Sequence, residues 1–252
     1  MTRRVVVEPV PDPARVAAQA ADGFAPATGA AGWTGVAVDV LRASSTLTRA
    51  KAHGAARVLP FADTAAAIAW RDAHPGTLAC GERDGRIVPG FDLGNSPSEY
   101  TAGRVRGRTL YFASTNGSWA MSHAAARGSR HDSWTLGSFV NATATLEGIE
   151  NYFEVLVACA GKLGRFALED AAFAGWLCAR LAERGARLAN DAARLAATLA
   201  PRDATEVRAL VEGCSHGRYL RSLGPEYARD VEFCSRLDAV GGSFELDSAG
   251  RY

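Results

Sequence analysis

Short turns rich in Ser, Thr, Asn and Gly recur along this chain, each after an apolar run of strand length. The turns DVLRASST, GERDG, STNGS, GSFVNAT and CAGKLGR are the ones able to bind an anion. Small residues let the backbone approach an anion closely, and the N–H groups of a following helix point at it. The hydroxyl groups of Ser44, Ser45, Thr46, Ser114 and Thr115 can donate to phosphate oxygens. Any single turn is better explained as an ordinary helix N-cap, and only the repetition predicts a shared anion site.

Asp39 interrupts the apolar run Val36–Val40, just before Arg42. A carboxylate within such a strand is costly unless it meets a cation. A metal ion or Arg42 can supply that cation, and a buried structural Asp–Arg pair explains the pattern equally well. Asp39 and Arg42 are therefore candidate catalytic residues.

Two adjacent carboxylates, Glu169 and Asp170, begin the helix expected after the CAGKLGR turn. Carboxylates in a first helical turn often interact only with the helix dipole. They also suit a hard cation such as Mg²⁺, which prefers oxygen ligands. Because Asp39 offers a third carboxylate, we favour the metal interpretation and predict a magnesium site formed by Asp39, Glu169 and Asp170.

A second chemistry is suggested by Cys159 and Arg165, which stand in a C-x5-R spacing. Cysteine-dependent phosphatases use that spacing to place a thiolate and a guanidinium around one phosphate. The hydroxyl residue usual after the arginine is replaced by Phe166, and a buried structural cysteine is the competing explanation. His216 and Arg218 are further cationic candidates: a lone histidine is usually a surface residue, whereas the arginine can bind a carboxylate with two hydrogen bonds.

The elements that must position these residues alternate between strands and helices. Strands are expected at Val5–Val7 (an edge strand), Val36–Val40, Val58–Phe61, Thr77–Cys80, Thr109–Ala113, Ser133–Gly137 and Tyr152–Ala158. Helices are expected up to Ala52, after the cap residues Asp63 and Thr64, from Trp119, over ALEDAAFAGWLCARLAE, and through most of Arg180–Asp238 with breaks at Pro201 and Gly224-Pro225. This alternation predicts a single α/β domain over residues 1–252, with three α/β/α layers, a mostly parallel or mixed sheet and a helical C-terminal third.

Composition excludes several classes of partner. The formal charge of +1 provides no basic field for nucleic acid or anionic lipid. The five cysteines are widely spaced without a CxxC pair, which indicates reduced thiols. The start MTRRVVVEPVPDP is unlike a signal peptide, and no apolar run approaches the roughly 20 residues of a membrane span. We therefore expect a cytoplasmic protein; a homodimer is compatible with the sequence but not indicated by it.

At these motifs the chain resembles the 2-phosphosulfolactate phosphatase family, the ComB-like proteins of coenzyme M biosynthesis. The matching stretches are VDVLRASST at Val38–Thr46, GERDG at Gly81–Gly85, GFDLGNSPSEY at Gly90–Tyr100, STNGS at Ser114–Ser118, ACAGKLGRFALED at Ala158–Asp170 and CSHGRYLRSLG at Cys214–Gly224. They run in order over most of the chain, and GFDLGNSPSEY is compositionally unusual. Departures from the family pattern at Ala167, at Phe173 and in the tail GGSFELDSAGRY bear on the substrate more than on the reaction class.

The resemblance implies a magnesium-dependent phosphohydrolase that converts (R)-2-phospho-3-sulfolactate into sulfolactate and phosphate. Such a substrate carries phosphate, carboxylate and sulfonate, so its site needs several cations. Besides the metal, the arginines expected to supply them are Arg42, Arg83, Arg165 and Arg218. Asn95 and Asn116 are expected to orient the substrate or the attacking water.

Three catalytic mechanisms and one role without catalysis remain open on the sequence. A metal ion can lower the pKa of a bound water, or Asp39 can itself attack and form an aspartyl-phosphate. The alternatives are a metal-independent cysteine phosphatase using Cys159 and Arg165, and a binding protein that holds a phosphorylated acid without turnover. The carboxylate set speaks against a pure anion binder, which gains little from buried negative charge.

Overall fold

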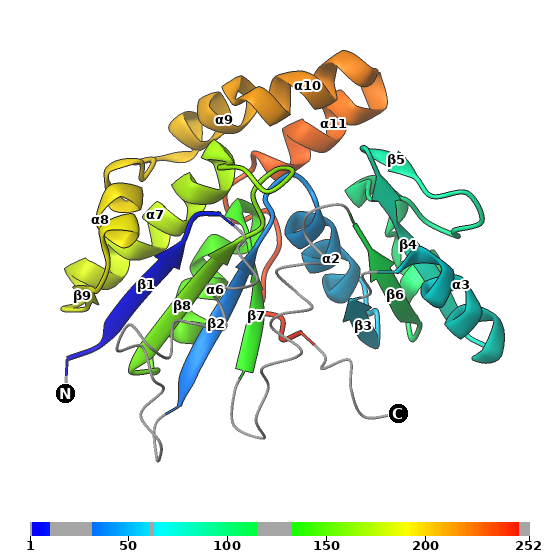
Figure 1. The fold of residues 1–252 in the computed structure, drawn as a ribbon, viewed down its shortest axis with the longest axis horizontal. Helices are drawn as coiled ribbons and strands as arrows, with labels where there is room; N and C mark the ends of the chain where they lie inside the picture. The colour runs from blue at the N-terminus through cyan, green and yellow to red at the C-terminus, as the bar shows by residue number, and fades with distance from the viewer. Residues whose placement is uncertain (1, 11–31, 61–62, 115–132, 247–252) are drawn as a thin grey trace.

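The computed structural model of the protein describes residues 2–10, 32–60, 63–114 and 133–246. Within these ranges the chain forms two β-sheets with helices packed around them (Figure 1). No helix in these ranges is long and apolar enough to cross a membrane.

The first sheet has five parallel strands in the order β7-β2-β8-β1-β9. Their bounds are Arg4–Glu8 (β1), Trp33–Val38 (β2), Ser133–Gly137 (β7), Glu154–Cys159 (β8) and Arg187–Leu188 (β9). Every residue of β2 and β8 is buried, as expected for parallel strands covered on both faces. Because the strands are parallel, the chain leaves β2 and β8 at the same edge of the sheet.

The second sheet has the order β3-β6-β4-β5 and is mixed. Its strands are Arg57–Pro60 (β3), Thr77–Arg83 (β4), Arg86–Ile87 (β5) and Thr109–Ala113 (β6). Strands β3, β6 and β4 are parallel, whereas β5 turns back on β4. Asp84 and Gly85 form that turn with φ of 53° and 82°, the positive angles that a two-residue type I′ turn requires and that Asp-Gly supplies at low cost.

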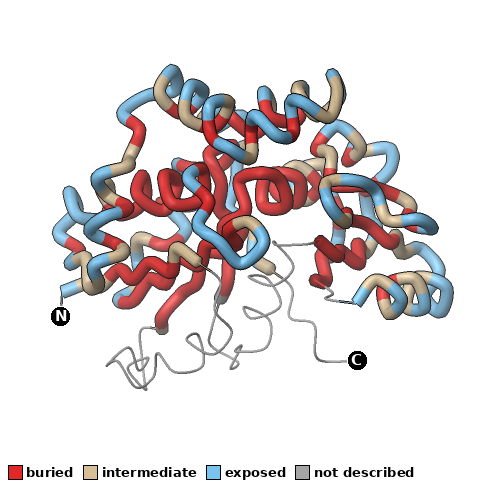
Figure 2. Tube along the Cα trace, turned by 45° about the horizontal axis from the view of Figure 1, so that its top comes forward, coloured by how far each residue is buried: buried red, intermediate tan, exposed pale blue. Residues whose placement is uncertain are grey.

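Helix α2 (Ala43–Ala52) lies between the two sheets (Figure 1). Its Leu47 belongs to one buried cluster with Leu156 of the first sheet and with Leu110 and Phe112 of the second. The opposite face of the first sheet packs on α6 (Ala142–Ile149) and α7 (Leu168–Glu183), and α3 (Thr64–Ala73) covers the outer face of the second sheet. Buried residues run through the centre of the molecule, while the C-terminal helices are buried on one side only (Figure 2).

Four helices form the C-terminal region: α8 (Asp191–Thr198), α9 (Ala204–Gly213), α10 (Ser215–Leu223) and α11 (Pro225–Cys234). In the part of the chain that the structure describes, the remaining helical segments are α4 (Ala102–Val105) and the 3-10 turns Pro97–Glu99 and Phe139–Asn141. In Figure 1, α9, α10 and α11 cross above the edge of the first sheet at which β2 and β8 end. These helices therefore cover the strand ends where an α/β fold binds its ligands.

The α/β class, the mostly parallel strands and the helical C-terminal region are as predicted, and Asp63 caps α3 by accepting from the Ala65 amide at 2.9 Å. Two expectations were wrong. β1 is not an edge strand, because β8 and the short β9 pair with its two sides. β2 ends at Val38, so Asp39 follows the strand instead of interrupting it. The helix expected from Trp119 lies outside the described residues.

Candidate active site

A pocket of about 320 Å³ lies where the ends of β2 and β8 meet the β4–β5 hairpin and helix α10. Five separate segments of the described chain line it: Asp39, Leu41 and Arg42; Glu82, Asp84 and Gly85; Asn95; Lys162 and Leu163; and His216, Tyr219 and Leu220. Of these residues, Asp39, Arg42, Asn95 and His216 were predicted from the sequence to belong to the site. The pocket is large enough for a small polar ligand.

The turn after β2 holds Asp39 through Ser44. The Ser44 hydroxyl donates to the Asp39 carbonyl at 2.7 Å and accepts from the Asp39 amide at 3.0 Å. The hydroxyls of Ser45 and Thr46 donate to the Val40 and Asn95 carbonyls at 2.9 and 3.1 Å. A hydroxyl has one proton to donate, so in this arrangement the three side chains brace the turn instead of donating to phosphate oxygens as predicted.

Asp39 is 6% exposed and sits among other acids. Burial, followed by the charge of Glu82, raises the pKa of its carboxyl group to about 7, although the Ala43 amide donates to it and Arg42 opposes the shift. An ionised carboxylate in such surroundings is stabilised by a cation. Asp39 is therefore the residue of this pocket best suited to bind a cation or a proton.

Arg42 is held from two sides. Its guanidinium donates to the Asp230 carboxylate at 2.6 Å and to the Gly85 carbonyl at 2.8 Å, and it lies over the Tyr227 ring at 5.2 Å. The side chains of Arg42 and Asp230 are 4% and 3% exposed. The sequence offered Asp39 and Arg42 as a buried pair, but the hydrogen-bonded partner of Arg42 is Asp230, which lies 188 residues away on α11.

Glu169 and Asp170 do not line the pocket, and both are 2% exposed. Glu169 accepts from His216 Nδ1 at 3.0 Å, and this partner lowers the pKa of the Glu169 carboxyl group against the effect of burial. Asp170 accepts from the Val40 amide at 2.8 Å and from the Gly161 amide at 3.0 Å. Asp170 thus ties the turn after β2 to the turn after β8, and burial raises its pKa well above the usual range.

Lys162 enters the pocket from the turn after β8. Its amide donates to the Arg165 carbonyl at 2.9 Å, and the Arg165 amide donates back at 3.0 Å. Leu163 and Gly164 between them have φ of 51° and 71°, so the turn is a tight one. Lys162 Nζ lies 4.1 Å from the centre of the Tyr219 ring on α10. Lys162 was not predicted from the sequence, although its place in the CAGKLGR turn offered the signal.

Two oxygen-bearing side chains complete the pocket. Asn95 is 5% exposed, and its Oδ1 atom is buried without a hydrogen-bond partner. Glu82 is 6% exposed and accepts from the Gly85 amide at 2.7 Å. Glu82 was missed because Arg83 was selected from the GERDG motif as a cation for the substrate. Alternate residues of a strand face opposite sides, and here Glu82, not Arg83, faces the pocket.

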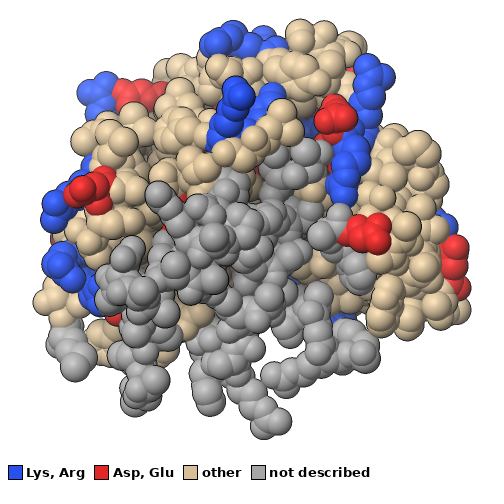
Figure 3. Space-filling view, in the orientation of Figure 1, with Lys and Arg blue, Asp and Glu red and all other residues tan. Residues whose placement is uncertain are grey.

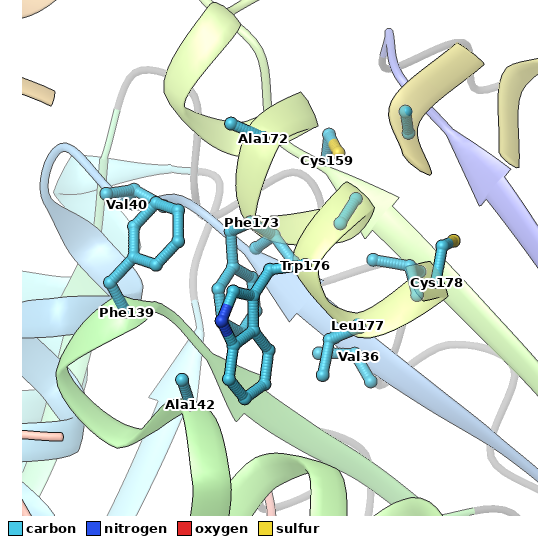
Figure 4. Close-up of a cluster of buried hydrophobic side chains, with 14 of the residues drawn as sticks. Val36, Val40, Phe139, Ala142, Cys159, Ala172, Phe173, Trp176, Leu177 and Cys178 are labelled. Atoms are coloured by element: carbon cyan, nitrogen blue, oxygen red, sulfur yellow. The ribbon is translucent and has the colours of Figure 1, made fainter. Parts of the chain in front are cut away.

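Several predicted site residues lie elsewhere. Cys159 is fully buried in the apolar cluster that contains Phe173 and Cys178 (Figure 4), and burial raises its pKa well above the usual range. Arg165 is exposed, and neither residue lines the pocket. This geometry disfavours a cysteine nucleophile, which must be an accessible thiolate.

Arg83, Ser114 and Arg218 are also absent from the lining of this pocket. Ser114 is buried at 4% exposure, and Arg218 is exposed and donates to the Gly213 carbonyl on α9. Thr115 and Asn116 lie outside the described residues. On the face seen in Figure 3, the described basic side chains lie in separate groups and do not form one continuous basic surface.

Within the described ranges, no three His, Cys, Asp or Glu side chains are grouped so that they could hold a metal ion alone. Asp39, Glu169 and Asp170 influence one another's charge, but the last two are hydrogen-bonded to His216 and to backbone amides. A metal at this site would need other oxygen donors beside Asp39.

The family model for 2-phosphosulpholactate phosphatase matches residues 24–242. The chain belongs to this family. A probable 2-phosphosulfolactate phosphatase of Thermotoga petrophila is 36% identical over 205 residues, covering 81% of this chain and 85% of the relative. Proteins of the same name from Synechococcus sp. strain JA-3-3Ab and Gloeobacter violaceus are each 38% identical, covering 81% and 85% of this chain and 85% and 89% of the relatives.

The family expectation is thereby confirmed, and the chain is a phosphoric monoester hydrolase of the 2-phosphosulfolactate phosphatase type. The matched range 24–242 contains every described residue that lines the pocket. This pocket is accordingly the candidate active site of the enzyme.

Proposed function

We propose that the enzyme hydrolyses the phosphate ester of a 2-hydroxy acid, (R)-2-phospho-3-sulfolactate, with the help of magnesium. One observation carries the proposal. Among the described residues, the pocket is lined by the acids Asp39, Glu82 and Asp84 but by only two full cations, Arg42 and Lys162, and Arg42 already faces Asp230. A substrate with phosphate, carboxylate and sulfonate groups cannot enter such a pocket favourably unless a further cation is present.

The donors of the pocket fit magnesium. Asp39 and Glu82 are close enough for the charge of one to raise the pKa of the other, and the Asn95 Oδ1 atom is buried without a partner. Mg²⁺ prefers oxygen ligands and is commonly held by one or two carboxylates together with substrate phosphate. In our proposal Asp39, Glu82 and Asn95 hold the ion, in place of the set Asp39, Glu169 and Asp170 expected from the sequence.

When bound, magnesium would neutralise phosphoryl charge and favour ionisation of an attacking water. Arg42 has five N–H donors, of which its bonds to Asp230 and Gly85 use two. The remaining donors can bind phosphoryl oxygens in a fixed direction, because the two bonds hold the guanidinium in place. Asp170 keeps the two catalytic turns together through its bonds to Val40 and Gly161.

Two routes break the P–O bond to the 2-hydroxy acid. Water attacks phosphorus directly, or the Asp39 carboxylate attacks first and the aspartyl-phosphate is then hydrolysed. Rapid acid quenching with radiolabelled substrate separates them, since only the second route leaves label on the protein and only while Asp39 is present.

The function is tested by measuring phosphate release from a panel of 2-phospho-hydroxy acids, with Mg²⁺ and with excess EDTA. We expect release from 2-phosphosulfolactate that EDTA abolishes and added Mg²⁺ restores. Full activity in EDTA that is lost in Cys159→Ser would instead establish the cysteine phosphatase. Saturable binding without phosphate release from any member of the panel would establish a binding protein.

A further inference from the structure

The cations of the pocket do not match the anionic groups of the substrate one for one. Arg42 is bound to Asp230 and to the Gly85 carbonyl. The other arginines expected at the site, Arg83, Arg165 and Arg218, do not line it. Among the described lining residues, this leaves Lys162 as the full positive charge without an ion-pair partner within 4 Å.

Lys162 is fixed at both ends. Its backbone closes the tight turn with Arg165 through two hydrogen bonds. Its ammonium group lies 4.1 Å from the centre of the Tyr219 ring, within the range of a cation–π interaction. A lysine held in this way loses little further side-chain freedom when an anion binds.

Two elements supply three apolar side chains to the part of the pocket that holds Lys162, while the charge of Glu169 also acts on its ammonium group. Leu163 follows it in the turn, and Tyr219 and Leu220 come from α10. Leu163 and Tyr219 are 65% and 41% exposed, whereas Leu220 is 1% exposed. Burial lowers the pKa of Lys162. The ammonium group is thus partly withdrawn from water, and its attraction for an anion is stronger than in bulk water.

We propose that Lys162, with the collar of Leu163, Tyr219 and Leu220, forms a subsite for the anionic group that the substrate carries at the far end from its phosphate. The inference rests on the proposed function and adds to it the residue that selects among phosphorylated acids. The phosphate then lies with Asp39 and Arg42 on the turn after β2, and the distal sulfonate or carboxylate lies against the turn after β8.

The test compares three substrates with different ends: 2-phosphosulfolactate, 2-phosphomalate and 2-phospholactate, which carry a sulfonate, a carboxylate and a methyl group. Lys162→Met keeps most of the apolar stem and removes the charge. We expect kcat/KM to fall about 10- to 100-fold for the first two substrates, mainly through KM, because one charge-assisted hydrogen bond is lost. For 2-phospholactate we expect less than about a threefold change.

The chain offers a matched control, since Lys51 and Lys162 are its only lysines. Lys51 lies in α2 and donates to the Ala56 carbonyl at 3.3 Å. Lys51→Met should leave all three kcat/KM values unchanged, and Lys162→Arg should recover part of the preference for the anionic ends. An equal loss with all three substrates, or no loss with any, would refute the subsite. A loss confined to one of the two anionic substrates would show which anion Lys162 selects.

A second measurement does not depend on turnover. Acetic anhydride acylates both lysines, and mass spectrometry reads each one separately. 2-Phosphosulfolactate bound with Ca²⁺ in place of Mg²⁺ should protect Lys162 and leave Lys51 reactive, whereas inorganic phosphate should protect Lys162 much less. Protection of Lys162 without phosphate release would support the subsite and reject the phosphatase proposal. Phosphate release without protection of Lys162 would support the phosphatase proposal and refute the subsite.

Discussion

At the scale of single residues, Asp39 is an acid of the pocket whose surroundings are unlike water. Burial raises the pKa of its carboxyl group most, and the charges of Glu82 and Glu169 raise it further to about 7. In the folded protein the ionised form of Asp39 is therefore destabilised unless a cation is near. Such destabilised groups are typical of active sites, where the cost is compensated by ligand binding.

Asp39→Asn removes this charge and keeps the shape of the side chain. We expect phosphate release to fall by at least about 10³-fold, because both the cation and the attacking group depend on the carboxylate. Steady-state kinetics with saturating Mg²⁺ measure the loss. Asp191→Asn, whose side chain is 99% exposed on α8, is the matched control and should keep normal kinetics. Activity within tenfold of the parent enzyme would remove Asp39 from the mechanism.

The same substitution has a pH signature in the metal-free protein. Between about pH 4 and 7 the unfolded chain loses the Asp39 proton while the folded chain keeps it. The free energy of unfolding therefore falls as pH rises through this window, by an amount on the order of a few kcal/mol. Urea unfolding at a series of pH values should show a shallower decline for Asp39→Asn. Parallel curves for the two proteins would mean that Asp39 ionises normally.

Cys159 has a packing role, because its thiol is fully buried among apolar side chains. Cys159→Ala should keep kcat within about threefold and lower the free energy of unfolding by roughly 1 kcal/mol, the usual effect of a small core cavity. Cys178→Ala, at an equally buried position of the same cluster, should behave alike. A much larger loss of activity in the first variant than in the second would return Cys159 to the active site.

At the scale of elements, the ion pair of Arg42 and Asp230 joins the start of α2 to α11. Asp230 also accepts from the Ser96 hydroxyl at 2.5 Å, so it connects three segments around the pocket. Asp230→Ala leaves a buried guanidinium without its counter-ion, which typically costs 3–5 kcal/mol. We expect that loss in urea unfolding, together with a higher KM because Arg42 is no longer oriented.

Glu232 on the same helix provides the control. It pairs with Arg236 at 2.8 Å, but both side chains are about half exposed. Surface pairs of this kind contribute little, so Glu232→Ala should change the free energy of unfolding by less than about 0.5 kcal/mol and leave KM unchanged. If the two variants were equally stable, the buried pair would not hold α11 in place.

Local signals in the sequence predicted most of the elements correctly. The buried run of β8, the Asp63 cap of α3 and the breaks at Pro201 and Gly224-Pro225 each have a cause within a few residues. The β4–β5 hairpin was missed although Asp84-Gly85 is a strong turn signal, because the following strand has only two residues. A strand of two residues is too short to show the alternation of apolar and polar residues by which strands are recognised.

At the scale of the whole molecule, two features could not be predicted from local patterns. The strands divide into two sheets with α2 between them. This division depends on packing of both sheets against α2, and no single strand carries a signal for it. Asp230 is an ordinary helical acid in the sequence, and only the fold brings it to Arg42. The strand-end rule located Asp39 and Arg42, because the edge of a parallel sheet gathers them, and His216 was found from its own motif, which the structure places on α10. Asp230 on α11 and Glu82 beside the hairpin were missed.

The pocket joins five segments from both sheets and from α10, so ligand binding should stabilise the molecule as a unit. With ligand at a hundred times its Kd, linkage adds about 2.7 kcal/mol, which corresponds to roughly 5–10 °C in Tm for a chain of this size.

Because phosphate and Mg²⁺ neutralise each other in an acidic pocket, each should strengthen binding of the other by the same factor. Differential scanning fluorimetry should therefore show a larger shift with both than the sum of the separate shifts, and Asp39→Asn should abolish the excess. Merely additive shifts would place the two ions at separate sites.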